Sequence, residues 1–156
     1  MREVSIVGPG DGEIIDLGPA RLRVLEDGTT TSHRLGISES TLAPHTPGPP
    51  QHRHLRHDEG FYIVSGTAVF TVRETDYQAP PGTLVMVPPG APHTFANPGD
   101  EPVVMVTTFT PDLYLQYFRE VSEALADGAS MAEATGRTIG RYATEMATDY
   151  AQDGWS

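Results

Sequence analysis

Short runs of apolar and β-branched residues, separated by turns, dominate the first two thirds of the chain. The strongest runs lie at residues 61–64, 67–72, 83–87 and 103–109, and they are rich in Val, Ile, Phe, Tyr and Thr. Glycines and prolines interrupt the chain about every eight to twelve residues, a spacing that indicates a sandwich or barrel rather than alternating strands and helices. We therefore expect an all-β domain.

Weaker apolar segments precede these runs, at residues 4–7, 14–17 and 22–25. A turn signal separates each segment from the next, so we interpret them as strands or strand edges. Residues 44–50 contain four prolines, which lack the amide donor that a continuous ladder needs. This segment is expected to be a loop that leads into a cluster of histidines.

The pattern changes after residue 110, where a helix is expected. Thr110 can cap it, Pro111 suits its first position, and apolar residues recur every fourth position from Leu113 to Leu125. This spacing predicts an amphipathic helix that ends near Gly128.

A second, weaker helix is predicted after the first. Ser130 and Glu133 have the spacing of a capping box, and the helical pattern continues through Tyr142 despite two interior glycines. The predicted organisation is a β-barrel over residues 1–110, a helical extension packed on the barrel over 111–144, and a flexible tail over 145–156.

Length, charge and composition narrow the class of protein. A chain of 156 residues is one domain's worth, and its net charge of −11 would repel nucleic acid and anionic lipid. The sequence contains no cysteine, so a bound metal must have nitrogen and oxygen ligands. No secretion signal or membrane-spanning run is visible, and the expected location is the cytoplasm.

Three side chains in the middle of the chain have the spacing of metal ligands. His52 and His54 are two residues apart, so on a strand both imidazoles point to the same side. Glu59 lies at an odd offset from them, so residues 55–58 must turn or bulge if its carboxylate is to join the histidines. Glu59 would then begin the next strand.

A fourth candidate ligand, His93, follows the proline-rich turn at residues 88–92, which would present it at a fixed angle. Two hairpins would thereby converge on one metal. Asn97 is expected to hydrogen-bond to backbone in the next turn. The expected apolar lining of a substrate pocket, on the same interior faces, is Phe61, Ile63 and Phe95.

Imidazole and carboxylate suit one divalent transition metal, and Fe, Ni, Zn, Mn, Co and Cu remain alternatives because the same ligands serve them all. Four protein ligands around an octahedral ion leave two positions open, which favours a catalytic over a structural ion. The other histidines, His33, His45 and His57, are expected to be solvated or to lie behind the ligands.

These residues resemble the two motifs of the cupin superfamily. In the first motif, His52, His54, Glu59 and Gly66 match. In the second, every fixed position matches, namely Gly82, Pro88, Gly90, His93 and Asn97. One position departs from the family: Thr46 stands where the first motif begins with glycine, and Gly48 lies nearby.

The resemblance implies a double-stranded β-helix, or jelly-roll barrel, with the metal inside its wider mouth and a homodimer as the common assembly. It also implies a small-molecule substrate, and two chemistries stay open. The first is dioxygenase-type oxidation of a phenolic or enol metabolite, in which Glu59 leaves the metal and accepts the substrate proton. The second is a polyketide-cyclase-like or isomerase reaction without redox change. A non-catalytic small-molecule-binding cupin is a third hypothesis.

Overall fold

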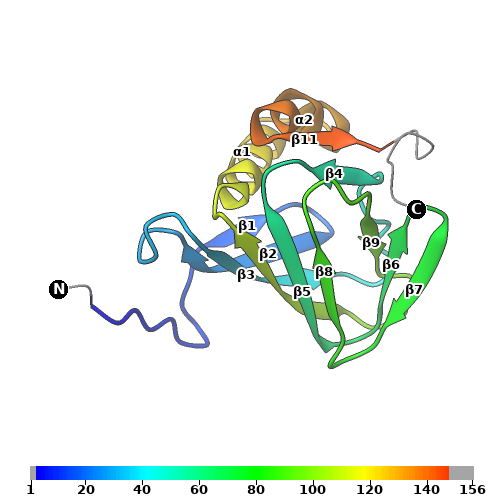
Figure 1. Cartoon of the computed structure of the whole chain (residues 1–156), viewed down its shortest axis with the longest axis horizontal. Coiled ribbons are helices and arrows are strands. Elements are labelled where there is room, and N and C mark those ends of the chain that lie inside the picture. Colours follow the sequence, from blue (N-terminus) through cyan, green and yellow to red (C-terminus); the bar gives the residue numbers. More distant parts are fainter. Residues whose placement is uncertain (1–2, 148–156) are drawn as a thin grey trace.

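The computed structural model describes residues 3–147 of the chain. The largest sheet in this part is antiparallel, and Figure 1 shows it curving around one side of the barrel. From one edge to the other it contains β1 (Ile14–Asp16), β2 (Ala20–Asp27), β3 (Gly36–Leu42), β10 (Val103–Thr110), β5 (Asp58–Ser65) and β8 (Leu84–Val87).

Two smaller ladders form the opposite wall of the barrel. One runs β7 (Thr75–Ala79), β6 (Ala68–Val72) and β9 (Thr94–Ala96), and the other pairs β4 (His52–His54) with β11 (Thr144–Met146). An isolated bridge between His52 and His93 joins the two ladders side by side. The expectation of an all-β domain is therefore confirmed.

The interior of the barrel is filled by alternate residues of facing strands, because successive side chains of a strand point to opposite faces. Phe61 of β5 packs edge to face on Phe70 of β6, with ring centroids 5.2 Å apart. Each such fully buried side chain stabilises the fold by about 1.5–3 kcal/mol. The buried members of this core are Leu42, Phe61, Ile63, Ala68, Phe70, Ala79, Val87, Val103 and Met105.

A helical extension follows the barrel, but its first helix begins later than expected. Helix α1 spans Tyr114–Ala126, and its N-cap residue, Leu113, makes no side-chain cap hydrogen bond. Thr110 instead belongs to β10, where it pairs with Asp58 of β5, and the Thr110–Pro111 peptide bond is cis. Thr110, which the sequence pattern assigns to the helix cap, is therefore the last residue of a paired strand.

The second helix follows its sequence signals. Helix α2 (Met131–Thr138) has the predicted capping box, in which Ser130 Oγ accepts from the backbone N–H of Glu133 and the Glu133 carboxylate accepts from the backbone N–H of Ser130. A short 3₁₀ helix, η1 (Ile139–Tyr142), continues it. Strand β11 (Thr144–Met146) covers the first two residues of the predicted tail, and residues 148–156 lie outside the described part.

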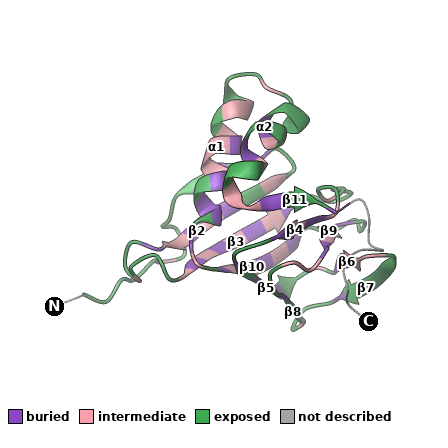
Figure 2. Ribbon diagram, turned by 45° about the horizontal axis from the view of Figure 1, so that its top comes forward, coloured by how far each residue is buried: buried purple, intermediate pink, exposed green. Residues whose placement is uncertain are grey.

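Figures 1 and 2 show α1, α2 and β11 gathered at one end of the barrel, beside β4. A second apolar cluster joins them to the N-terminal strands, and its buried members are Ile15, Leu17, Leu22, Val24, Phe109, Tyr114, Leu115, Tyr117, Val121 and Ala134. The extension is therefore packed on the barrel through its own core. Neither helix within residues 3–147 has the length and apolar character needed to cross a bilayer.

The predicted N-terminal strand at residues 4–7 does not form. Val4 and Ile6 are 88% and 86% exposed, and the segment runs away from the body of the molecule (Figure 1). Apolar residues alone do not make a strand without a partner ladder, and the first paired strand is β1.

Candidate metal centre

Strand β4 turns both of its histidines into the barrel. His52 and His54 are buried, and the residue between them is only partly buried. The chain then bends at residues 55–56 and enters β5, so that Glu59 is buried on the inner face with Phe61 and Ile63. The bend required by the odd offset of Glu59 is therefore present.

His93 reaches the same place from the other hairpin. His52 and His93 exchange two backbone hydrogen bonds, with N···O distances of 3.0 and 2.9 Å. Asn97 holds the following turn, since its amide Nδ2 donates to three backbone carbonyls at 2.9 to 3.3 Å. The prediction for Asn97 is confirmed, and the two hairpins are joined by backbone at the histidines themselves.

The departure from the first cupin motif leaves the loop path intact. Thr46 is buried, its hydroxyl donates to the Ala43 carbonyl at 2.7 Å, and its backbone pairs with Asn97. Gly48 is the glycine that the loop needs, because a Cβ there would lie 1.5 Å from the carbonyl oxygen of Phe95.

Three imidazoles lie together inside the barrel, with ligand atoms within 4.8 Å of one another, and one carboxylate lies beside two of them. The ring centroids of His52, His54 and His93 lie 4.6 to 5.2 Å from one another. Glu59 Oε2 is 2.9 Å from Nε2 of His54 and 3.1 Å from Nε2 of His93. All four side chains are buried.

Hydrogen bonds at Nδ1 orient all three rings. Nδ1 of His52 lies 2.9 Å from the Pro50 carbonyl and Nδ1 of His93 lies 3.1 Å from the Ala91 carbonyl. A carbonyl only accepts, so a proton on Nδ1 satisfies each of these bonds and leaves a lone pair on Nε2. The Nε2 of His93 also lies 3.1 Å from Glu59 Oε2, so this ring is held at both nitrogens. Nδ1 of His54 lies 2.8 Å from the Thr144 hydroxyl, which leads to the same tautomer.

The protonation states also suit metal binding. Burial lowers the pKa of His52 from 6.5 to about 4, with further lowering by the neighbouring His93 and His54. Burial alone would raise the pKa of Glu59, but the interactions with His54 and His93 outweigh it and hold this pKa below its ordinary value. Neutral His52 and ionised Glu59 are the metal-binding forms of these groups.

The surroundings of one buried nitrogen indicate whether these residues fit a metal ion. Nε2 of His54 has no hydrogen-bond partner within residues 3–147, although it lies 2.9 Å from Glu59 Oε2. A lone pair facing a carboxylate at this distance is repulsive unless a cation lies close to both. This donor set of nitrogen and oxygen therefore fits a divalent transition metal and could hold one.

His57 is a fourth imidazole at this site, and it is buried rather than solvated, with a ligand atom within 4.8 Å of those of His54 and Glu59. It is only 6% exposed, its ring lies 4.2 Å from the ring of His54, and its Nε2 has no hydrogen-bond partner in the described part of the chain. Burial, and to a smaller extent the neighbouring His54, lowers the pKa of His57 to about 4. The alternative, a position behind the ligands, agrees with this placement.

His33 and His45 lie away from the ligands, as expected. Both are largely exposed. Nδ1 of His33 lies 2.9 Å from an Asp112 carboxylate oxygen, and Nε2 of His45 lies 2.9 Å from an Asp100 carboxylate oxygen. The hydrogen bond with Asp112 raises the pKa of His33.

The three predicted pocket residues lie at different depths. The ring of Phe61 is 6.3 Å from that of His93, so it borders the ligand group. Ile63 is fully buried two residues further along β5, and Phe95 is partly buried against Phe61 and Phe70. Phe61 is thus the member of this set nearest to the ligands along β5.

Two buried hydroxyl groups on the inner face of the large sheet were missed from the sequence, because no sequence pattern marks them. Ser38 of β3 and Thr107 of β10 are direct partners in the ladder, and Thr107 also faces Phe61 of β5. Both hydroxyl oxygens are buried without a hydrogen-bond partner within residues 3–147. The diagonal neighbour of Thr107 on β5 is Glu59, a relation that places Cβ atoms roughly 7–8 Å apart.

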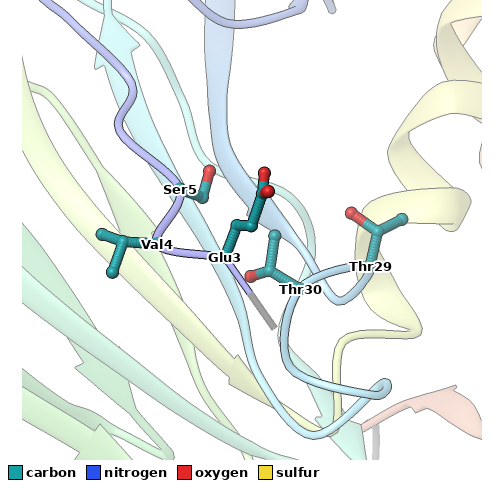
Figure 3. A pocket seen from close by; sticks show the side chains of 5 residues that line it. All are labelled: Glu3, Val4, Ser5, Thr29 and Thr30. Atoms are coloured by element: carbon teal, nitrogen blue, oxygen red, sulfur yellow. The ribbon is translucent and has the colours of Figure 1, made fainter. Parts of the chain in front are cut away.

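A surface hollow elsewhere does not compete with this site. It lies where the N-terminal segment passes the loop after β2 (Figure 3), and its lining residues are Glu3, Val4, Ser5, Thr29 and Thr30. These contain one carboxylate and no imidazole, so they offer no comparable ligand set.

Comparison with known protein families matches residues 38–109 to the Cupin domain model. This chain contains a cupin domain. The matched segment of the cupin includes all four candidate ligands, His52, His54, Glu59 and His93. A search of curated proteins gives no match to the sequence.

Solved structures agree with the assignment to the cupin superfamily and with the jelly-roll fold. A polyketide cyclase, RemF from Streptomyces resistomycificus, is 18% identical with a TM-score of 0.60, covering 73% of this chain and 94% of that chain. An RmlC-like cupin from Shewanella frigidimarina NCIMB 400 is 23% identical with a TM-score of 0.58, covering 71% and 95%.

A sugar phosphate isomerase of the cupin superfamily from Silicibacter pomeroyi DSS-3 is 22% identical, with a TM-score of 0.53. Its alignment covers 59% of each chain, so the cupin described here spans somewhat more than half of that relative. At these identities the likeness establishes the shared fold.

Proposed function

We propose that this cupin is a metal-dependent enzyme that acts on a small phenolic or enolic metabolite, with dioxygenase-type oxidation as its reaction. The observation that carries the proposal is the buried group of His52, His54 and His93, whose ligand atoms lie within 4.8 Å of one another, with the Glu59 carboxylate beside two of them. The proposed ligands are His52, His54, Glu59 and His93. Around an octahedral ion they leave two positions, enough for one substrate oxygen beside dioxygen.

The surroundings of the ligand group support a flat substrate that carries oxygen. The ring of Phe61 lies beside that of His93. The unpartnered hydroxyls of Ser38 and Thr107 lie on the paired strands β3 and β10 of the same sheet. Buried hydroxyls without partners are costly, by about 1–3 kcal/mol each, so a substrate oxygen that bonds them would be favoured over a plain hydrocarbon. Phenols and enols combine a planar apolar body with such oxygens.

The bound metal would supply Lewis acidity that favours the ionised form of a substrate hydroxyl. Glu59 is the group that we assign as proton acceptor, because it is ionised and buried beside His54 and His93. His52 and His93 are anchored by carbonyls in their own segments, so they would keep their positions when Glu59 takes up the proton.

The experiment that tests this function begins with metal analysis of protein purified without chelator. Oxygen-electrode assays with flavonols and aromatic polyketides would follow, using the metal found. Oxygen uptake that depends on the metal supports the proposal. Protein that retains no transition metal, and gains none on reconstitution, would overturn it.

A non-redox reaction is the second candidate, because the polyketide cyclase RemF shares the fold over most of its length. The same ligands could polarise a ketone so that Glu59 removes the adjacent proton, and ring closure or isomerisation would follow without oxidant. Turnover under anaerobic conditions would favour this reaction over oxygenation. Tight binding of a metabolite without turnover in either condition would favour a non-catalytic binding cupin.

We also propose that the cupin forms a homodimer through the outer face of β5 and β8. Strand β8 is an edge of the six-stranded sheet, and four apolar side chains at this edge are about half exposed. Tyr62 pairs with Leu84 and Gly60 with Met86, so these residues share one face. The patch consists of Tyr62, Val64, Leu84 and Met86, and such contiguous exposure marks interaction surfaces.

Light scattering during size-exclusion chromatography tests the dimer. Leu84→Lys should convert the dimer to a monomer, because it places a charge in the centre of the patch. Leu113→Lys is the matched control, since Leu113 is equally exposed but precedes α1, away from the patch. A wild-type protein that elutes as a monomer, or a Leu84→Lys variant that stays dimeric, would contradict this surface.

A further inference from the structure

We propose that Thr144, in the last strand of the helical extension, is a positioning residue for the metal ligand His54. Its hydroxyl fixes both the tautomer and the orientation of that ring, so the extension is part of the metal centre. This inference rests on the proposed metal function.

The direction of the hydrogen bonds around Thr144 is determined by its neighbours. Its Oγ1 lies 2.8 Å from Nδ1 of His54 and 3.2 Å from the carbonyl oxygen of Tyr142. The carbonyl can only accept, and the hydroxyl also hydrogen-bonds the Tyr114 side chain, so either of these partners takes the single hydroxyl proton away from His54. The hydroxyl oxygen must then accept the proton of His54 Nδ1, which leaves the lone pair of this ring on Nε2.

The backbone holds the hydroxyl in place. Strand β11 pairs with β4 so that Thr144 faces His54 and Met146 faces His52. Two further backbone hydrogen bonds close the ladder at its ends, from Leu55 N to Ala143 O at 2.8 Å and from Ala147 N to Gln51 O at 2.9 Å. The position of the hydroxyl therefore depends on a ladder rather than on a single side-chain rotamer.

His54 differs in this respect from the other two histidines. Nδ1 of His52 and of His93 bonds a carbonyl only two residues away, so those rings are oriented within their own segments. For His54 the partner lies 90 residues away, in the extension. The ring of Tyr114, from α1, packs on His54 with centroids 4.5 Å apart but leaves its Nδ1 to Thr144.

Without the Thr144 hydroxyl, the proton of His54 has no defined place. The ring can then adopt the tautomer with its proton on Nε2, which faces Glu59 and cannot bind metal in that form. Partners of this kind orient ligand rings and typically contribute about 10- to 100-fold to metal affinity. We expect a loss within this range when the hydroxyl is removed.

The test compares three variants of the full chain. Thr144→Val keeps the shape of the side chain and removes the hydroxyl, and Thr144→Ser keeps the hydroxyl. Thr138→Val is the matched control, because Thr138 is equally buried in the same extension and its hydroxyl bonds the Ala134 carbonyl at 2.8 Å, away from the ligands. Affinities for Zn²⁺ and Co²⁺ would be measured by competition with a chromophoric chelator, and the Co²⁺ forms by visible absorption.

Thr144→Val should bind both ions about 10- to 100-fold more weakly than wild type and should alter the Co²⁺ absorption bands. Thr144→Ser should recover most of the affinity, and Thr138→Val should match wild type in both readouts. Urea unfolding of the metal-free proteins separates an effect on the ligand from a general loss of stability, because both valine variants remove one buried hydroxyl.

The outcomes distinguish this inference from the proposed function. Wild-type protein that binds neither ion overturns the metal function and the inference with it. Wild type that binds metal while Thr144→Val binds equally well, with an unchanged Co²⁺ spectrum, overturns the inference alone. Equal losses in Thr144→Val and Thr138→Val would also refute it, because the effect would then come from the extension as a whole.

Discussion

The buried His52 should make the stability of the metal-free protein depend on pH. Its pKa is lowered from 6.5 to about 4, mainly by burial. Between these two values the unfolded chain takes up a proton at His52 and the folded chain does not. Acid therefore favours the unfolded state, and the contribution of this residue to stability falls as the pH drops from about 6.5 towards 4.

The size of the effect follows from the two pKa values. One pKa unit corresponds to about 1.4 kcal/mol, and at pH 5 most of the proton uptake by the unfolded chain has occurred. The free energy of unfolding should then be about 2 kcal/mol lower at pH 5 than at pH 7 on account of His52 alone. Glu59 does not add to this window, because its pKa lies below its ordinary value of 4.5 and its contribution is lost only at lower pH.

Urea unfolding of chelator-treated protein at pH 7 and pH 5 measures the effect. His52→Asn is the comparison, because asparagine does not titrate in this range. His57, whose pKa is also lowered to about 4, is present in both proteins and cancels in their difference. If wild type and His52→Asn lose the same stability between the two pH values, His52 is not buried in its neutral form and the reasoning is refuted.

Further predictions concern the ligands and the loops that hold them. His93→Ala and His52→Ala should each lose most of the bound metal, seen by elemental analysis, while circular dichroism shows a folded barrel; His33→Ala should keep its metal, and equal retention in all three would contradict the ligand assignment. Gly48→Ala should destabilise the protein by about 2 kcal/mol or more in urea unfolding, because its Cβ would lie 1.5 Å from a carbonyl oxygen of β9. Asn97→Ala should cost about 3 kcal/mol in the same assay, because one buried and two partly buried carbonyls lose their donor; a change below 1 kcal/mol would argue against that network.

The close approach of the candidate ligands could be predicted because each part of it depends on local geometry. The two-residue spacing of His52 and His54, the bend before Glu59 and the rigid turn before His93 all act within short segments. In the surrounding strands, buried and less buried residues alternate as apolar and polar residues do in the sequence. The barrel could therefore be predicted as well.

Contacts between distant segments explain what the sequence pattern missed. Thr110 has the features of a helix cap, yet the ladder between β10 and β5 extends to it. His57 looks like any loop histidine, and its burial depends on the rings of Phe109 and Tyr114 that pack around it. Nothing near Thr144 in the sequence indicates that its hydroxyl meets His54.

The distance of 90 residues between His54 and Thr144 has a consequence for how the protein matures. A ribosome completes the whole segment 38–109 before it adds the threonine. A nascent barrel can therefore present His52 and His93 in their final orientation while His54 still lacks its anchor. Tight metal capture should accordingly follow the synthesis of β11, and the cell's metal supply would act on a chain that already contains this strand.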